Sequence, residues 1–169
     1  MVTAAKTMVL LKNSEEFLPL KTKRDLNGRS LKHVVLLGPF STNITELLGS
    51  YTTHVDPANT IPLDKALEKI SENITASDIC IDGGKCTVYD DPDIDLISIT
   101  VGTGQNVEDE ARDRHDINLP GYQKQFLLDA LDLAAGRGVI RRTPVPVILL
   151  VFSSGPVDIE AAVEDRNVC

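Results

Sequence analysis

The sequence predicts an α/β fold: a three-layer sandwich with a mostly parallel, open sheet and helices on both faces. Three short, largely apolar runs, at 33–37, 95–101 and 146–152, each end at a turn that contains glycine. Runs of this length and composition are typical of strands that are buried on both faces. Segments with helical signals separate them, and alternating strands and helices favour a parallel sheet that is covered on each side.

The helical segments before the second strand carry different signals. Apolar residues at helical spacing predict a short helix over 2–12, and the basic, polar stretch 21–32 is expected to be a surface loop. Asn43 and Glu46 resemble a capping box for a helix through Leu48. Pro62 suits the first position of a further helix. The apolar face of that helix would consist of Leu63, Ala66, Leu67 and Ile70.

The best-defined helix is expected over 121–135, after the second strand. An apolar stripe at helical spacing runs along it, and we assign that stripe to the core. The stripe consists of Tyr122, Phe126, Ala130 and Leu133. Residues 157–164 start one more helix after the third strand.

Composition and charge exclude several classes of partner. The chain has 169 residues, 42% of them apolar, and a formal net charge of −8. An acidic surface argues against nucleic acid or an anionic membrane as the main partner, but it is compatible with neutral sugars. Tryptophan is absent and aromatic residues make up only 4%, so part of any sugar site is expected to lie elsewhere. No apolar run is long enough to span a membrane.

Cysteines and glycosylation motifs bear on the cellular compartment. Cys80 and Cys86 flank a Gly-Gly pair, and the sequence leaves open whether they form a disulfide or remain two thiols. No metal ligands cluster near them, and Cys169 is terminal. Asn43-Ile44-Thr45 and Asn73-Ile74-Thr75 fit the Asn-x-Ser/Thr pattern of N-glycosylation. These motifs favour a secretory route for the parent protein. The start of this chain resembles no secretion signal.

Three loops are expected beyond the carboxyl ends of the strands, where open parallel sheets place their functional groups. They cover 38–43, 102–119 and 153–157. The second is the longest, and it holds four acids and two arginines between Glu108 and Arg114. Such a loop can hold a carboxyl group in a setting that raises its pKa, so that it donates a proton to a leaving oxygen. A solvated, salt-bridged surface loop has the same composition, so both interpretations stay open.

Two other motifs fail as functional sites. Gly102-Thr103-Gly104 follows a strand, but Val107 stands where a dinucleotide loop requires its third glycine. Ser153-Ser154-Gly155 lacks one of the two glycines that flank a nucleophilic serine. Neither a nucleotide cofactor nor a metal is therefore expected. His115 fits a solvent-exposed loop residue as well as a sugar contact, and His33 and His54 have no partner visible in the sequence.

The acidic loop resembles a family signature. Residues 108–114 (Glu-Asp-Glu-Ala-Arg-Asp-Arg), followed by 119–123 (Leu-Pro-Gly-Tyr-Gln), are similar to the Glu-x-Glu-x-x-Asp-Arg … Leu-Pro-Gly-x-Gln signature of family 3 glycoside hydrolases. The match is closest to the β-xylosidase branch. Four further segments resemble the family in the same order along the chain: 9–20, 35–39, 49–63 and 143–159.

This resemblance implies a fold and a division of labour. The family combines a (β/α)₈ barrel, which carries an aspartate nucleophile, with an α/β sandwich that lends the acid/base glutamate. The reaction retains anomeric configuration, and its two carboxyl groups stand about 5–5.5 Å apart. By position in the motif Glu110 matches the acid/base, with Glu108 as the runner-up. Asp113 and Arg114 match the Asp-Arg pair of the motif, and we interpret them as ordering the loop, with contact to sugar as a further role. Tyr51 would either line the sugar site or pack.

The chain also departs from the family pattern. No barrel is present, only 90–93 joins the Cys86 region to the second strand, and the chain ends shortly after Ile159. Residues 1–169 are therefore expected to form one incomplete C-terminal sandwich domain. Its partners would be the parent's barrel and an oligosaccharide, and the fragment alone would be inactive. The alternatives are a non-catalytic interaction or regulatory module and a small-ligand domain unrelated to sugars.

Overall fold

A parallel sheet forms the centre of the molecule. The computed structural model describes residues 6–20, 31–49, 51–52, 56, 60–78, 91–137 and 143–169. The four strands of the sheet lie in the order β2-β1-β3-β4, and every neighbouring pair is parallel. Their bounds are His33–Leu37 for β1, Asn73–Ser77 for β2, Leu96–Gly102 for β3 and Val147–Phe152 for β4. The questions of a Cys80–Cys86 bridge and of His54 lie outside the described residues.

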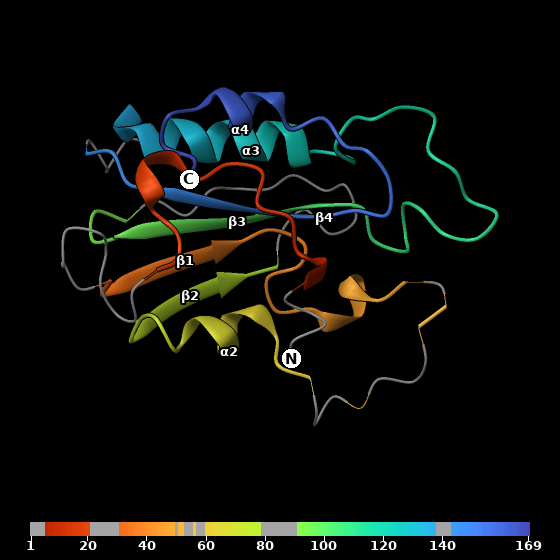
Figure 1. Ribbon diagram of the computed structural model, residues 1–169, viewed down its shortest axis with the longest axis horizontal. Helices are drawn as coiled ribbons and strands as arrows, with labels where there is room; N and C mark the ends of the chain where they lie inside the picture. The colour runs from red at the N-terminus through yellow and green to blue at the C-terminus, as the bar shows by residue number, and fades with distance from the viewer. Residues whose placement is uncertain are drawn as a thin grey trace.

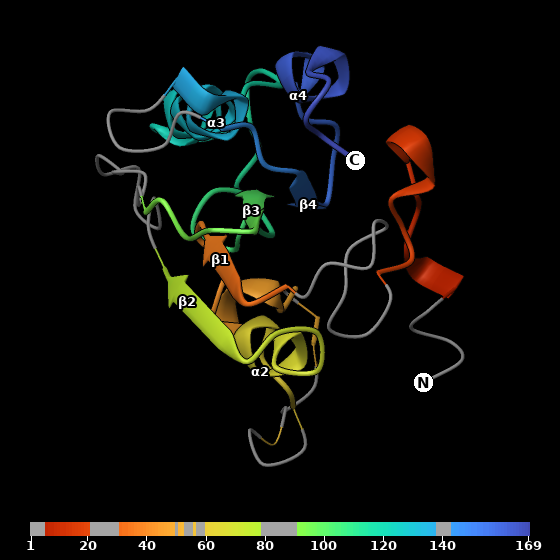
Figure 2. The ribbon, with the colours of Figure 1, turned by 90° about the vertical axis from the view of Figure 1, so that its left-hand side faces the viewer.

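Helices cover both faces of this sheet, as the sequence predicts. Helix α2, Leu63–Leu67, lies on one face, and α3, Gln123–Asp132, lies with α4, Glu160–Glu164, on the other (Figures 1 and 2). A π turn, η4 (Leu133–Arg137), continues α3, and two 3₁₀ turns occupy Ser14–Glu16 (η1) and Ile44–Leu47 (η2). Within the described part of the chain, no helix is both long enough and apolar enough to cross a membrane.

The two central strands form the core. Every residue of β1 and β3 is buried. Alternate side chains of these strands point to opposite faces. Val35 and Ile97 pack with Phe126 of α3 on one face. On the other, Val34 and Leu96 pack with Leu67, at the end of α2. This packing explains why the strands appear in the sequence as apolar runs instead of alternating ones.

The core face of α3 differs from the predicted stripe. Tyr122 precedes the first helical residue and is 47% exposed, so its assignment to the core was wrong. The buried face includes the other three residues of the predicted stripe. It consists of Gln123, Phe126, Leu127, Ala130 and Leu131 in α3, with Leu133 and Ala134 in the following turn. The polar Gln123 therefore occupies a core position, which requires partners for its amide group.

The predicted strands at 33–37, 95–101 and 146–152 are confirmed by β1, β3 and β4. Strand β2 was not predicted. The short helix expected over 2–12 is wrong for its described part, because only Lys6 and Thr7 are helical and the residues after them are not. Met8 and Val9 are 76% and 78% exposed, so their apolar character reflects no packed helix face.

Two predicted helix starts hold with changes in detail. The side chain of Asn43 accepts a hydrogen bond from the amide of Thr45 at 2.9 Å, as an N-cap does, but the element that follows is the 3₁₀ turn η2. Pro62 is the residue just before α2 and not its first helical residue.

Strand β4 forms one edge of the sheet, and the described part of the chain pairs with only part of its outer side. The amide of Val147 donates to the carbonyl oxygen of Asn167 at 2.8 Å, and the amide of Cys169 donates to the carbonyl oxygen of Val147 at 3.0 Å. Val168 thereby forms an isolated parallel bridge with Val147. From Ile148 to Phe152 the strand is half-buried.

Candidate functional site

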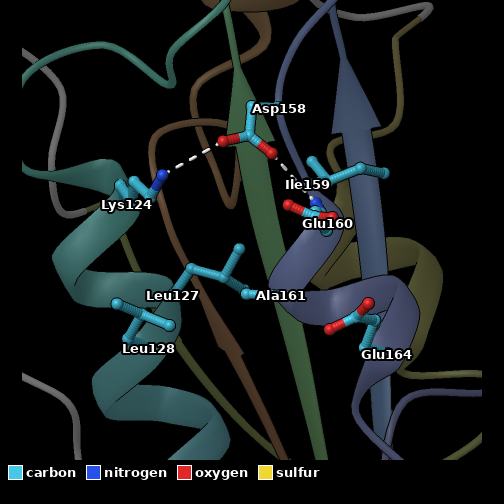
Figure 3. Close-up of a pocket in the computed structure, with 8 residues that line it drawn as sticks. All are labelled: Lys124, Leu127, Leu128, Asp158, Ile159, Glu160, Ala161 and Glu164. Carbon is cyan, nitrogen blue, oxygen red and sulfur yellow. Dashed lines mark hydrogen bonds and ion pairs between the residues drawn. The ribbon is translucent and has the colours of Figure 1, made fainter.

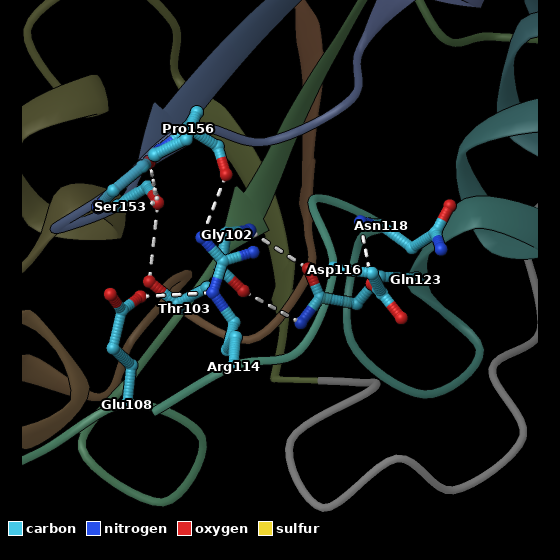
Figure 4. Close-up of polar contacts among 10 residues, drawn as sticks. Gly102, Thr103, Glu108, Arg114, Asp116, Asn118, Gln123, Ser153 and Pro156 are labelled. Carbon is cyan, nitrogen blue, oxygen red and sulfur yellow. Dashed lines mark hydrogen bonds and ion pairs between the residues drawn. The ribbon is translucent and has the colours of Figure 1, made fainter. Parts of the chain in front are cut away.

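Loops that follow β3 and β4 meet at the carboxyl edge of the sheet (Figure 4). The amide of Thr103 donates to the carbonyl oxygen of Phe152 at 2.8 Å. The hydroxyl groups of Thr103 and Ser153 lie 3.2 Å apart. These contacts join the two strand ends, and the segment from Thr103 to α3 extends beyond them (Figure 1). The acidic loop is therefore built on a rigid base.

Gln123 joins the two ends of the acidic loop. Its Oε1 accepts a hydrogen bond from the amide of Gly102 at 2.8 Å, and its Nε2 donates to the carbonyl oxygen of Gly102 at 3.0 Å. Gly102 has a φ of +141°, and a Cβ there would stand 1.7 Å from the carbonyl oxygen of Phe152. Only glycine fits this backbone. The end of β3 and the start of α3 are thus held together.

Arg114 ties the middle of the loop to the end of β4. Its Nε donates to Oε2 of Glu108 at 3.0 Å, and its Nη2 donates to the carbonyl oxygen of Pro156 at 2.7 Å (Figure 4). The Arg114 side chain is only 12% exposed and that of Glu108 is 26% exposed. The pair is consequently shielded from solvent more than an ordinary surface ion pair.

Glu108 is stabilised as an anion. Burial by itself raises the pKa of this carboxyl, but hydrogen bonds from Ser154 and Thr103 and the charge of Arg114 outweigh burial. The pKa of Glu108 is therefore lowered below its usual value. Gly155 packs closely on the pair, since a Cβ there would lie 3.2 Å from both Arg114 Nη2 and Glu108 Oε1.

Glu110 occupies a tight turn at the outer part of the loop. The amide of Asp109 donates to the carbonyl oxygen of Arg112 at 3.2 Å, and the reverse bond measures 2.9 Å. Ala111 has a φ of +62°, at the third position of this turn. The side chain of Asp109 accepts from the amide of Glu110 at 2.8 Å. Glu110 itself is exposed.

A shallow, open hollow lies beside the Glu108–Arg114 pair. It is lined by Glu108, Pro156 and the segment 113–117. The structure thus brings Glu108, Asp113, Arg114 and His115 together at one place. Glu110 is not among the lining residues.

Tyr51 lies apart from this cluster. Its side chain is 83% exposed, in the segment that follows η2. The preceding turn η2 reaches the acidic loop through Glu46, whose Oε1 accepts from Nδ2 of Asn106 at 3.4 Å. A Cβ on Gly104 would stand 2.1 Å from Oε2 of the same glutamate. Strands β1 and β4 lie on opposite sides of β3 in the sheet. The loop after β1 therefore supports the acidic loop on one side, and the segment after β4 supports it on the other.

A second hollow lies between α3 and α4 (Figure 3). Lys124 and Asp158 cross it with an ion pair of 3.0 Å, and Leu127 and Ile159 contribute apolar surface. No motif points to this hollow. Among the described residues, no group of three or more His, Cys, Asp or Glu side chains is placed to hold a metal ion.

Sequence reasoning missed three residues of the site. Gln123 is the last residue of the Leu-Pro-Gly-x-Gln motif, and the sequence predicted no role for it. A glutamine at the start of an apolar helix face is nevertheless a signal for a buried polar contact. Thr103 and Ser154 also contact Glu108. They follow the ends of β3 and β4, so the rule that selected the acidic loop could have found them.

Comparison with known proteins gives a consistent result. The family model described as "Glycosyl hydrolase family 3 C-terminal domain" matches residues 8–168. Beta-D-xylosidase 3 of Arabidopsis thaliana is 29% identical over 98% of this chain. Exo-1,4-beta-xylosidase bxlB of Emericella nidulans is 31% identical over 95% of it. The chain spans about one fifth of these relatives, 20% and 19% respectively.

Solved structures share the fold. A beta-glucosidase from Listeria innocua in complex with isofagomine matches 95% of this chain and 20% of its own, with a TM-score of 0.66 and 20% identity. A family 3 exo-beta-xylosidase, XlnD, matches 92% of this chain and 18% of its own, with a TM-score of 0.63 and 21% identity. Because the family model covers nearly the whole sequence, the chain belongs to the glycosyl hydrolase family 3 C-terminal domain family.

Proposed function

We propose that this chain is the sandwich domain of a retaining β-glycosidase of the β-xylosidase type, acting on terminal O-glycosidic bonds. In this proposal Glu110 is the acid/base residue and a barrel domain supplies the nucleophile. The relatives are β-xylosidases by name, and the chain spans about one fifth of their length. Residues 1–169 would thus be one domain of a larger enzyme. The glycosylation motifs support a secreted parent.

The different surroundings of Glu108 and Glu110 support the assignment of Glu110 as the acid/base residue. A general acid must hold its proton until the leaving oxygen departs, so it needs a raised pKa. The pKa of Glu108 is lowered, since Ser154, Thr103 and Arg114 stabilise its anion more than burial opposes it. Glu110 is free of that ion pair and exposed on a rigid turn. A docked domain that covers an exposed carboxyl disfavours its charged form by desolvation, as a proton donor requires.

In this proposal the hydrolysis of the glycosidic bond takes two steps. In the first, Glu110 gives its proton to the glycosidic oxygen while the barrel carboxylate attacks the anomeric carbon and the carbon–oxygen bond breaks. In the second, the Glu110 carboxylate takes a proton from water, whose oxygen displaces the barrel carboxylate. Retention requires the two carboxyl groups to stand about 5–5.5 Å apart, so the domain interface must bring the barrel to the outer end of this loop.

The remaining site residues receive distinct roles. Asp113 is exposed at the hollow and accepts hydrogen bonds from sugar hydroxyl groups in this proposal. Arg114 is occupied by Glu108 and Pro156, so it orders the loop. Tyr51 offers an exposed ring for the sugar face, beside the loop after β1.

A fusion of this chain to the barrel of Arabidopsis Beta-D-xylosidase 3 tests the assignment. In that fusion Glu110→Gln is expected to lower kcat on nitrophenyl xyloside about 10²–10⁴-fold, the range that general acid catalysis contributes. The loss of kcat/KM, which reports the first step, should be much smaller on dinitrophenyl xyloside, because its leaving group needs no proton in that step. Azide should restore turnover of the intermediate and give xylosyl azide, because this anion attacks the anomeric carbon and displaces the barrel carboxylate without the help of a general base.

Glu108→Gln is the matched control, and it should not show azide rescue. The 169-residue chain alone should hydrolyse nothing measurable, since it lacks the nucleophile. Azide rescue in Glu108→Gln and not in Glu110→Gln would transfer the role to Glu108. Equal rates for both variants and the parent fusion would overturn the proposal and favour a non-catalytic module.

A further inference from the structure

The loop that bears Glu110 is attached to the sheet at more than its two ends. Its ends are fixed by the amide of Gln123, which bonds both backbone groups of Gly102. A loop of this length would still move between such anchors unless side chains tie its middle to the body of the molecule. The question is therefore which contacts limit the position of Glu110.

One long-range contact leads from the middle of the loop to another strand end. Arg114 Nη2 donates to the carbonyl oxygen of Pro156 at 2.7 Å, across 42 positions of sequence. The bonds of Arg112, by contrast, go to the carbonyl oxygens of Gln105 and Asn106, inside the same loop. Arg112 thus shapes the loop, whereas Arg114 attaches it to the segment after β4.

Glu108 extends that attachment toward the turn. It receives Arg114 Nε at 3.0 Å and contacts the hydroxyl groups of Thr103 and Ser154. Its carboxylate is therefore held from both strand ends at once, after β3 and after β4. Gly155 leaves room for this arrangement, because any larger residue would press a Cβ against the ion pair.

We infer that Glu108 and Arg114 form a positioning pair, which holds the turn carrying Glu110 at a fixed place on the sheet edge. Glu108 precedes Asp109, the first residue of that turn, and Glu110 follows Asp109. A displacement of Glu108 moves the turn with it. The inference rests on the proposed function for its catalytic consequence, but the positioning itself is a property of this chain alone.

The first experiment uses the chain alone and measures amide hydrogen exchange in the turn. Arg114→Met is expected to speed exchange of the Arg112 amide about tenfold, and Arg114→Lys should restore part of the protection. Arg137→Met is the matched control, because Arg137 pairs with Asp132 at an exposed site far along the chain. It should leave exchange in the turn unchanged.

A pH series adds a readout that a general loss of stability would not give. Protection of the turn should fall as the pH drops through the lowered pKa of Glu108, and Glu108→Gln should abolish this step. Among the described residues, the charged or titratable groups that line the hollow with Glu108 are Arg114, Asp113, His115 and Asp116.

The second experiment uses the fusion enzyme. Arg114→Met should lower kcat on nitrophenyl xyloside about 10–100-fold with little change in KM, and Arg114→Lys should recover part of the rate. The loss of kcat/KM should be smaller on dinitrophenyl xyloside, because the first step on this substrate needs no proton from Glu110. The profile of activity against pH should keep its acidic and basic limbs in Arg114→Met, and it should lose the basic limb in Glu110→Gln.

The positioning pair and the proposed function can be refuted separately. If exchange in the turn is the same in Arg114→Met and in the parent chain, the positioning pair is refuted, whatever Glu110→Gln does. If the turn loosens as expected but Glu110→Gln keeps full activity, the proposed function is refuted and the positioning pair stands. A loss in Arg114→Met that is equal for both leaving groups would also contradict the catalytic role of the pair.

Discussion

Gln123 is bonded to Gly102 through both ends of its amide, with distances of 2.8 Å and 3.0 Å. The two residues belong to α3 and β3, and both are buried. The single side chain therefore satisfies an amide and a carbonyl group that would otherwise be buried without partners. This relationship sets the geometry from which the acidic loop departs.

Replacing Gln123 by leucine should destabilise the fold. Each buried backbone group left without a partner costs about 1–3 kcal/mol, so Gln123→Leu should lower the free energy of unfolding by about 2–5 kcal/mol. Urea unfolding measures the change. Gln125→Leu is the control, because Gln125 bonds Asp129 on the exposed side of the same helix, and its change should stay within about 0.5 kcal/mol. Equal effects of the two substitutions would contradict this account.

Gly102 should tolerate no side chain. Its φ of +141° disfavours other residues, and a Cβ would stand 1.7 Å from the carbonyl oxygen of Phe152. Gly102→Ala should cost more than about 4 kcal/mol and should sharply reduce the soluble yield. Gly49→Ala makes the same chemical change where the nearest atom is 3.9 Å away, and it should behave like the parent chain in circular dichroism and thermal unfolding.

The packing of α3 on the sheet should depend on Phe126. Its side chain is 1% exposed and lies in the larger apolar cluster. Truncation of a buried phenylalanine to alanine costs about 3–5 kcal/mol, so Phe126→Ala should lower the urea midpoint strongly. Leu128→Ala, at a position that is 37% exposed, should cost much less. A similar loss for both would mean that α3 is not packed as described.

Asp158 should link α3 to α4 in a pH-dependent way. The amide of Glu160 and the ammonium group of Lys124 lower the pKa of this carboxyl. A lowered pKa contributes stability above the ordinary value near 4, and the contribution is lost as the pH falls through the lowered pKa. An NMR titration should place the Asp158 midpoint below that value, and Lys124→Met should raise it. An unchanged midpoint in Lys124→Met would contradict the role of the ion pair.

The central strands were predictable because burial on both faces leaves an apolar run as its trace. Strand β2 was not, since it lies at the edge of the sheet and its sequence from Asn73 to Ser77 resembles a loop in composition. The helix expected over 2–12 shows the opposite error. Met8 and Leu11 follow a helical spacing, but both are at least 70% exposed, and periodicity alone says nothing about whether a face has a partner.

The sequence predicted where the site lies on the fold, but it did not predict most of the side-chain contacts within the site. The rule that loops follow strand ends selected the acidic segment, and the motif selected Glu108 and Arg114 within it. The bond from Arg114 to Pro156 joins residues 42 positions apart, and no local pattern encodes such a pairing. The stabilised charge of Glu108 could not be inferred either, because it depends on hydroxyl groups from two other segments.

The outer edge of β4 has a consequence for handling the purified chain. From Ile148 to Phe152 its sequence is Ile-Leu-Leu-Val-Phe, without a lysine or proline to discourage pairing. Among the described residues, Val168 pairs with this edge, and it does so at Val147. Extended, uncharged strands of this kind act as templates for intermolecular sheets, so concentrated solutions of the 169-residue protein should turn cloudy and bind thioflavin.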